Sequence, residues 1–92
     1  MIDNFKDKLT EKIWDGEKTR LDSVLQQKAL LKLRYIHLAK ELNDLSMPPG
    51  NRLEVLRGNR KNQYSIRVDK PYRICFKWTG SDAVDVEFTD YH

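Results

Sequence analysis

The sequence predicts an α+β fold in which two N-terminal helices pack on one face of a small antiparallel sheet. Apolar residues recur at helical spacing through the first half of the chain, and they alternate with polar residues from residue 52 onward. Turn-forming segments separate the alternating runs, as they do in a meander of antiparallel strands. The 92 residues contain no internal repeat and no linker long enough to divide domains, so one domain, 1–92, is expected.

The first expected helix carries a single apolar stripe, made by Ile2, Phe5, Leu9 and Ile13. The first few of these residues are equally compatible with a short edge strand that leads into the helix. The dipeptide Asp15-Gly16 then gives a stop signal, because glycine is common just after the last helical turn.

The second expected helix begins near Asp22 or Ser23 and runs to about Lys40. Ser23 followed by Gln26 fits a capping box, in which each side chain bonds a free backbone N–H at the start of the helix. Apolar residues cover well over half of its circumference, so we expect it to be covered on two sides. The sheet is expected on one side, and the first helix or a partner on the other.

From residue 52 the alternation predicts one short strand and then three longer ones. Matching the apolar faces of the two longer hairpins places Ile66 beside Ile74, Arg67 beside Arg73, and Lys77 beside Asp85. Two arginines directly opposite each other repel. Their face is therefore expected to bind phosphate, or to hold Glu54 or Asp90 between them.

Charge, cysteine content and histidine spacing limit the partners, the location and the cofactors that this chain is expected to have. The formal net charge of +3 is weak evidence for a nucleic-acid partner, but basic residues gather in 51–73 and acidic residues close the chain. A single cysteine, Cys75, forms no internal disulfide and suits a reducing compartment. There is no membrane-spanning run or signal peptide, so the expected location is the cytoplasm. The two histidines have no metal-ligand spacing, and neither a metal nor another cofactor is expected.

The basic stretch and the C-terminus together carry the residue types that RNA cleavage without a metal requires. Such cleavage needs a base for the 2′-hydroxyl, cations for the crowded phosphate, and an acid for the leaving oxygen. Residues of all these types are predicted to lie on one surface: Glu54, Arg57, Arg67, Arg73, Asp90 and His92. His92 is alternatively a solvated tail, and Arg60 and Lys61 either contact backbone phosphates or simply form a solvated turn.

Four segments resemble a known family. They are residues 48–60 (PPGNRLEVLRGNR), 63–67 (QYSIR), 72–76 (YRICF) and the closing Asp90-Tyr91-His92. The chain resembles the HigB-type toxins of bacterial toxin–antitoxin systems, within the wider RelE-like group of ribosome-dependent mRNA endonucleases. The resemblance covers essentially the whole chain, and it implies the RelE-like toxin fold.

The resemblance further implies metal-independent cleavage of mRNA in the A site of the 70S ribosome, and inhibition of translation. It implies a HigA-like helix-turn-helix antitoxin as partner, with operator DNA contacted only through that antitoxin and no contact with a membrane. The family's active-site positions fall on Glu54, Arg57, Arg73, Asp90, Tyr91 and His92. Arg73 would stabilise the phosphate, His92 would move protons, and Asp90 and Tyr91 would orient the histidine and contact the nucleotide. Arg57, Arg60, Lys61 and Arg67 would bind RNA.

At two positions this sequence departs from the family pattern, which leaves the roles of those two residues undecided. Arg57 stands where lysine is often found, which keeps the charge but changes its geometry. Glu54 stands where some members have histidine, so the identity of the general base stays undecided. Two other functions also remain: a RelE-fold toxin that inhibits DNA gyrase, and an RNA- or ribosome-binding module without RNase activity.

Overall fold

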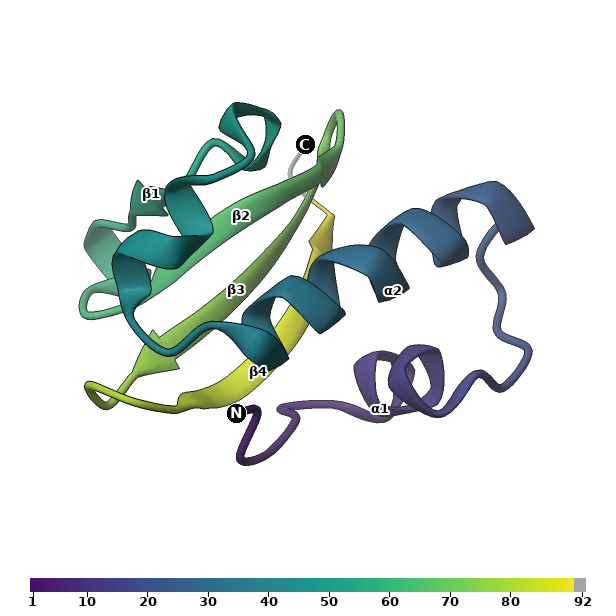
Figure 1. The fold of residues 1–92 in the computed structure, drawn as a ribbon. Coiled ribbons are helices and arrows are strands. Elements are labelled where there is room, and N and C mark those ends of the chain that lie inside the picture. The colour runs from purple at the N-terminus through teal and green to yellow at the C-terminus, as the bar shows by residue number, and fades with distance from the viewer. Residues whose placement is uncertain (91–92) are drawn as a thin grey trace.

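A computed structural model describes residues 1–90. It contains α1 (Lys8–Asp15), α2 (Ser23–Leu38), three 3₁₀ helices, η1 (Leu42–Ser46), η2 (Pro49–Asn51) and η3 (Gly58–Arg60), and four strands, β1 (Glu54–Val55), β2 (Tyr64–Asp69), β3 (Tyr72–Trp78) and β4 (Ala83–Asp90). The strands form one antiparallel sheet in the order β1-β2-β3-β4. Helix α2 crosses one face of this sheet, and α1 packs against α2 and β4 (Figure 1). The predicted α+β fold is confirmed.

Helix α1 begins later than its apolar stripe predicts. Asp7 caps the helix, with its Oδ1 accepting a hydrogen bond from the Thr10 backbone N–H at 2.9 Å. Ahead of this cap, Ile2 and Phe5 form isolated parallel bridges with β4. The expected helical start at Ile2 is therefore wrong, and the edge-strand alternative describes these residues better. The predicted end is confirmed, because Gly16 has a φ of 77° and closes the helix in the left-handed conformation.

Helix α2 has the predicted start but a different cap. The Asp22 carboxylate accepts hydrogen bonds from the backbone N–H groups of Val24 and Leu25, at 3.1 and 3.3 Å. Gln26 instead donates its side-chain amide to the carbonyl of Glu17 at 2.7 Å, so the predicted capping box is wrong. A carboxylate one residue earlier satisfies two free N–H groups at once, which the Ser23 hydroxyl would not do.

The coverage of α2 is confirmed only in part. Ala29, Leu33 and Ile36 are fully buried, and the sheet and α1 both contact the helix. A stripe at seven-residue spacing nevertheless remains exposed: Val24, Leu31 and Leu38.

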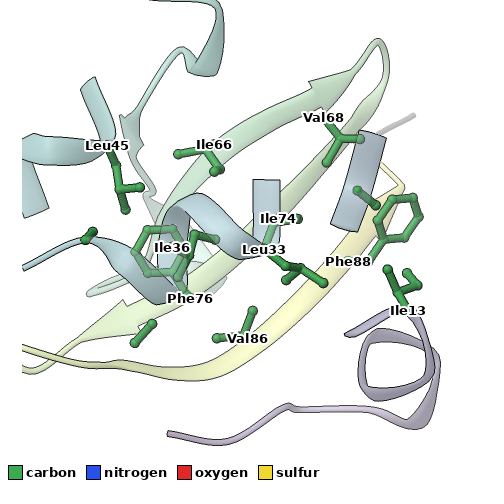
Figure 2. Packing of buried hydrophobic residues seen from close by; sticks show 13 residues of the cluster. Ile13, Leu33, Ile36, Leu45, Ile66, Val68, Ile74, Phe76, Val86 and Phe88 are labelled. Atoms are coloured by element: carbon green, nitrogen blue, oxygen red, sulfur yellow. The ribbon is translucent and has the colours of Figure 1, made fainter. Parts of the chain in front are cut away.

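The hydrophobic core lies between α2, α1 and the sheet. Leu33 and Ile36 of α2 point toward the strands, and Ile13 reaches the same cluster from α1 (Figure 2). The strands contribute Ile66, Val68, Ile74, Phe76, Val86 and Phe88, and Leu45 adds to the cluster from η1. These side chains occupy one face of β2–β4, so alternation sends the intervening residues to the opposite face.

The strand register is as predicted near the arginines and departs from the prediction at two irregularities. At the end of β2 the register shifts after Arg67, so Asp69 pairs with Tyr72 in place of the predicted Val68. Ile66 is paired with Ile74 and Arg67 with Arg73, as expected. In the next hairpin Asp85 has a φ of 53° and the register shifts, so that Lys77 lies opposite Val84. The predicted pairing of Lys77 with Asp85 is wrong as a backbone register, because the bulge adds one residue to β4. Their charges still meet, with Lys77 Nζ 3.4 Å from Asp85 Oδ2.

Three carboxylates predict that the fold loses stability in acid. Hydrogen bonds from the backbone N–H groups of Glu41 and Lys40 lower the pKa of Asp44 below 3.8. The pKa of Asp69 is lowered by the Lys28 ammonium, and the pKa of Asp85 by the Asn4 amide. A carboxyl group with a depressed folded-state pKa stabilises the fold above its unfolded-state pKa. That stabilisation is lost as pH falls through the folded-state pKa.

We expect the free energy of unfolding, measured with urea, to be nearly constant from pH 7 to 5 and to fall below about pH 4. The Asp44→Asn variant should show a smaller decline over that range. Asp3→Asn is the matched control, since residues 1–90 give this exposed carboxylate no side-chain hydrogen bond or ion pair. A decline of equal steepness in wild type and Asp44→Asn would contradict the assignment.

Candidate active site

The sheet face opposite α2 carries two adjacent rows of polar side chains. One row runs Glu54, Ser65, Cys75 and Glu87 across all four strands in register. The next row runs Arg67, Arg73 and Thr89 across β2, β3 and β4. Because side chains alternate along a strand, these residues point away from the face that packs under α2. The opposed arginines predicted from the sequence therefore lie on this face.

Arg73 is held in place by several acceptors around its guanidinium group. Its Nε donates to Ser65 Oγ at 2.7 Å, and its Nη2 donates to the carbonyl oxygens of Arg52 and Ser65 at 2.5 and 3.3 Å. Glu54 Oε2 lies 3.8 Å from the same Nη2. The Arg73 side chain is only 11% exposed, whereas that of Glu54 is 57% exposed. Glu54 thus supplies the negative charge that the opposed arginines were predicted to require.

A hollow of about 440 Å³ opens beside Arg73. Four cations and two carboxylates line it, together with Pro71 of the β2–β3 turn and Tyr72 of β3. The charged residues are Arg52, Arg67, Lys70, Arg73, Glu54 and Asp69. One of the carboxylates is already neutralised, because Lys28 Nζ of α2 lies 2.9 Å from Asp69 Oδ2. The hollow therefore favours an anionic ligand such as a phosphate group.

The carbonyl that Arg73 contacts belongs to the residue that follows a buried asparagine. Asn51 is fully buried, donates through Nδ2 to the carbonyls of Leu45 and Met47, and accepts from Lys32 Nζ at 2.5 Å. The next residue, Arg52, has a φ of 46°, which turns its carbonyl toward Arg73. Burial also lowers the pKa of the Lys32 ammonium. These bonds connect α2 to the arginine on the far face of the sheet.

The predicted RNA-binding residues separate into two groups. Arg67 lines the hollow, whereas Arg57, Arg60 and Lys61 do not. Arg60 is partly buried and forms an ion pair with Glu87, at 2.9 Å between Nη1 and Oε1. Glu87 is on β4, opposite the buried Cys75 of β3. The ion pair therefore reaches across the sheet from the β1–β2 connection to β4. Arg57 and Lys61 are exposed at the β1–β2 connection.

The end of β4 lies next to the hollow. Asp90 is paired with Tyr72, which lines the hollow, and Thr89 is paired with Arg73. Tyr91 and His92, both predicted as catalytic, lie outside the described residues. Sequence reasoning missed Ser65, Asn51, Arg52 and Lys70. The charge of Arg52 and Lys70 within the basic stretch was a usable signal, but nothing in the sequence marked Ser65.

Within residues 1–90, no group of three or more His, Cys, Asp or Glu side chains is arranged to hold a metal ion. None of the helices in this part of the chain has the length and apolar character needed to span a membrane.

Comparison with known proteins identifies the family. The family model described as "RelE-like toxin of type II toxin-antitoxin system HigB" matches residues 3–92. The chain belongs to the HigB-like toxin family. It is 38% identical over 90 residues to Toxin HigB-1 of Vibrio cholerae, an alignment that covers 96% of this chain and 94% of that toxin. It is also 35% identical over 65 residues to an uncharacterized protein of Haemophilus influenzae, covering 71% of this chain and 64% of that protein.

Membership confirms the resemblance predicted from the sequence. The chain is a HigB-like toxin of a type II toxin–antitoxin system, and such a toxin has an antitoxin as its partner. Its two helices and four-stranded antiparallel sheet are consistent with the RelE-like toxin fold. The polar sheet face with Arg73 and the cationic hollow is therefore the candidate active site of a HigB-like toxin.

Proposed function

We propose that this toxin is a ribosome-dependent endoribonuclease that cleaves mRNA in the ribosomal A site and thereby inhibits translation. The observation that carries the proposal is the Arg73 guanidinium, held at the edge of a cationic hollow large enough for a phosphate group. A cation fixed before the substrate arrives stabilises charge that develops in the transition state without having to reorganise. Membership of a toxin family related to RelE supports the same reading.

The proposed reaction is attack of the 2′-oxygen on the adjacent phosphorus, with a proton leaving the 2′-hydroxyl and another reaching the departing 5′-oxygen. The products are a 2′,3′-cyclic phosphate and a 5′-hydroxyl. Arg73 and Arg67 stabilise the charge on the phosphate oxygens. His92 serves as the general acid, or as the base if the assignment is reversed, and Asp90 and Tyr91 orient it and contact the nucleotide.

Glu54 has two possible roles in this scheme. A carboxylate 3.8 Å from Arg73 Nη2 is well placed to take the 2′-hydroxyl proton beside the phosphate that Arg73 binds. It also balances the charge of Arg73 in the free protein. The reaction as proposed is acid–base chemistry carried by side chains and uses no metal ion.

The proposed partners follow from the same assignment. In the cytoplasm a HigA-like helix-turn-helix antitoxin binds this toxin, and the complex reaches operator DNA only through the antitoxin. Free toxin acts on mRNA in the 70S ribosome. Arg57, Arg60 and Lys61 lie at the β1–β2 connection and do not line the hollow, so we place them along the RNA outside the reacting phosphate.

Primer extension on a defined mRNA in a translating extract tests the function. Wild-type protein should produce cuts within or next to codons, only while ribosomes translate. His92→Ala should lower the rate of cutting by about 10²- to 10⁴-fold, the usual contribution of a general acid or base. Arg34→Ala is the control, because Arg34 is an exposed cation on α2, away from the candidate site.

Two results would count against the proposal. An uncut message with unimpaired translation would favour a gyrase inhibitor, which a DNA-supercoiling assay would then detect, or an RNA-binding module without activity. Equal cutting by wild type and His92→Ala would remove the histidine from the mechanism.

A further inference from the structure

Ser65 holds Arg73 with two different groups. Its hydroxyl oxygen accepts a hydrogen bond from Nε at 2.7 Å, and its backbone carbonyl accepts one from Nη2 at 3.3 Å. Ser65 is fully buried. A hydroxyl removed from water needs a hydrogen-bond partner, and here the partner is a charged group, which makes the bond stronger than one between neutral groups. One residue therefore contacts two of the three nitrogens of the guanidinium.

The remaining acceptors lie around the same Nη2. The Arg52 carbonyl accepts from Nη2 at 2.5 Å, and Glu54 Oε2 is 3.8 Å away. Within residues 1–90 the third nitrogen, Nη1, donates no hydrogen bond. Since a guanidinium is planar, fixing Nε and Nη2 also fixes the direction in which Nη1 presents its two protons. Arg73 lines the hollow, so these protons are available to a ligand there.

We propose that Ser65 is a positioning residue, which fixes the Arg73 guanidinium so that Nη1 contacts a phosphate oxygen of the RNA. The catalytic consequence rests on the proposed function, whereas the positioning itself does not. Without the Ser65 hydroxyl, Nε loses its acceptor, and the guanidinium, then held only at Nη2 by backbone carbonyls, can rotate about its last side-chain bonds. A displaced cation stabilises the transition state less, even though the charge is still present.

The first experiment observes Arg73 directly in the free protein. In ¹H–¹⁵N spectra that include arginine Nε–H groups, the Arg73 signal is assigned by its loss in Arg73→Lys. Ser65→Ala should move this signal toward that of a solvated arginine. It should also speed the exchange of the Nε proton with water by about tenfold or more, because exchange requires the hydrogen bond to open.

The second experiment measures cleavage by Ser65→Ala under single-turnover conditions in the translating extract. We expect the maximal rate to fall by about 10- to 100-fold, while the half-saturating toxin concentration changes by less than about threefold. In an Arg73→Ala background, Ser65→Ala should cause no further loss, because both changes remove the same interaction.

Thr10→Val is the matched control for lost stability. Thr10 is also a fully buried residue whose hydroxyl accepts a backbone hydrogen bond, from Phe88 at 2.8 Å, but it is on α1 and does not contact Arg73. This variant should leave both the Arg73 signal and the cleavage rate unchanged. If Ser65→Ala does not fold, Ser65→Cys replaces it, since sulfur fills a similar space but is a weak acceptor. It should shift the same signal.

Two outcomes would overturn the proposal. One is an unchanged Arg73 Nε signal in the Ser65 variant, which would mean that the hydroxyl does not fix the guanidinium. The other is an equal loss of rate in Thr10→Val, which would assign the effect to stability alone. If wild-type protein does not cut mRNA, the proposed function fails, and the Nε signal still decides whether Ser65 positions Arg73.

Discussion

Replacing Arg73 by alanine is expected to lower the rate of mRNA cleavage by about 10²- to 10³-fold, the usual loss when a preorganised charge-stabilising donor is removed. The physical reason is the arrangement around its guanidinium: bonds to Ser65 and Arg52 hold the charge at the edge of the hollow before RNA binds. Arg73→Lys should recover only part of the activity. A lysine ammonium keeps the charge but lacks the planar set of donors that meets these acceptors together.

The measurement is single-turnover primer extension in the translating extract, with growth arrest after induction as a second readout. Circular dichroism should first establish that each variant is folded, because Arg73→Ala leaves Ser65 Oγ without its donor. Arg34→Ala controls for the loss of one positive charge from the surface. Arg73→Ala with full activity would exclude Arg73 from the site, and full activity in Arg73→Lys would show that charge without geometry suffices.

Much of the fold was predictable, because burial imposes periodicity on the sequence. The alternation of Tyr64, Ile66 and Val68 with Ser65 and Arg67 identified the two faces of β2, and the same pattern in β3 set the register of the arginines. The bulge at Asp85 was not predictable in this way. A non-glycine residue with positive φ leaves no periodic signal, and its extra residue shifts the pairing of β4 against Lys77.

The candidate site was predictable where charge marked it. Arg67 and Arg73 stand out on a strand, and repulsion between them required a compensating group, which Glu54 provides. The supporting residues are uncharged and were not visible in the pattern. Ser65 resembles any polar residue on an outer strand face, yet it is fully buried. Asn51 resembles a turn residue after Pro-Pro-Gly, and only the folded chain buries it, bonded to Lys32 and to the carbonyls of Leu45 and Met47.

Arg60 shows that the partner of a charged side chain cannot always be identified from the sequence. Its position in a loop beside Lys61 suggested a phosphate contact or a solvated turn. In the structure Arg60 forms a partly buried ion pair with Glu87. Glu87 is on β4, which is two strands away from β2 in the sheet. A long side chain can bury its stem over a sheet and reach a distant carboxylate, and local sequence does not reveal that reach.

Phe76→Ala is expected to reduce the free energy of unfolding by about 3–5 kcal/mol, the range for emptying a buried aromatic site. Phe76 is fully buried, and its ring centroid lies 6.2 Å from that of Tyr64 and 6.5 Å from that of Trp78. Small domains have a total stability of about 5–15 kcal/mol, so the loss is a large share. Urea unfolding measures it, and Val55→Ala, at an exposed position of β1, should change stability by less than about 0.5 kcal/mol.

Phe76 and Arg73 are on the same strand, β3, but alternation places their side chains on opposite faces. The two substitutions should therefore separate folding from chemistry. Phe76→Ala should lose activity only in proportion to the unfolded fraction, and cooling or a stabilising osmolyte should restore it. Arg73→Ala should remain inactive under those conditions because the folded molecule lacks the cation. A folded Phe76→Ala protein that is as inactive as Arg73→Ala would mean that the core and the site are not independent.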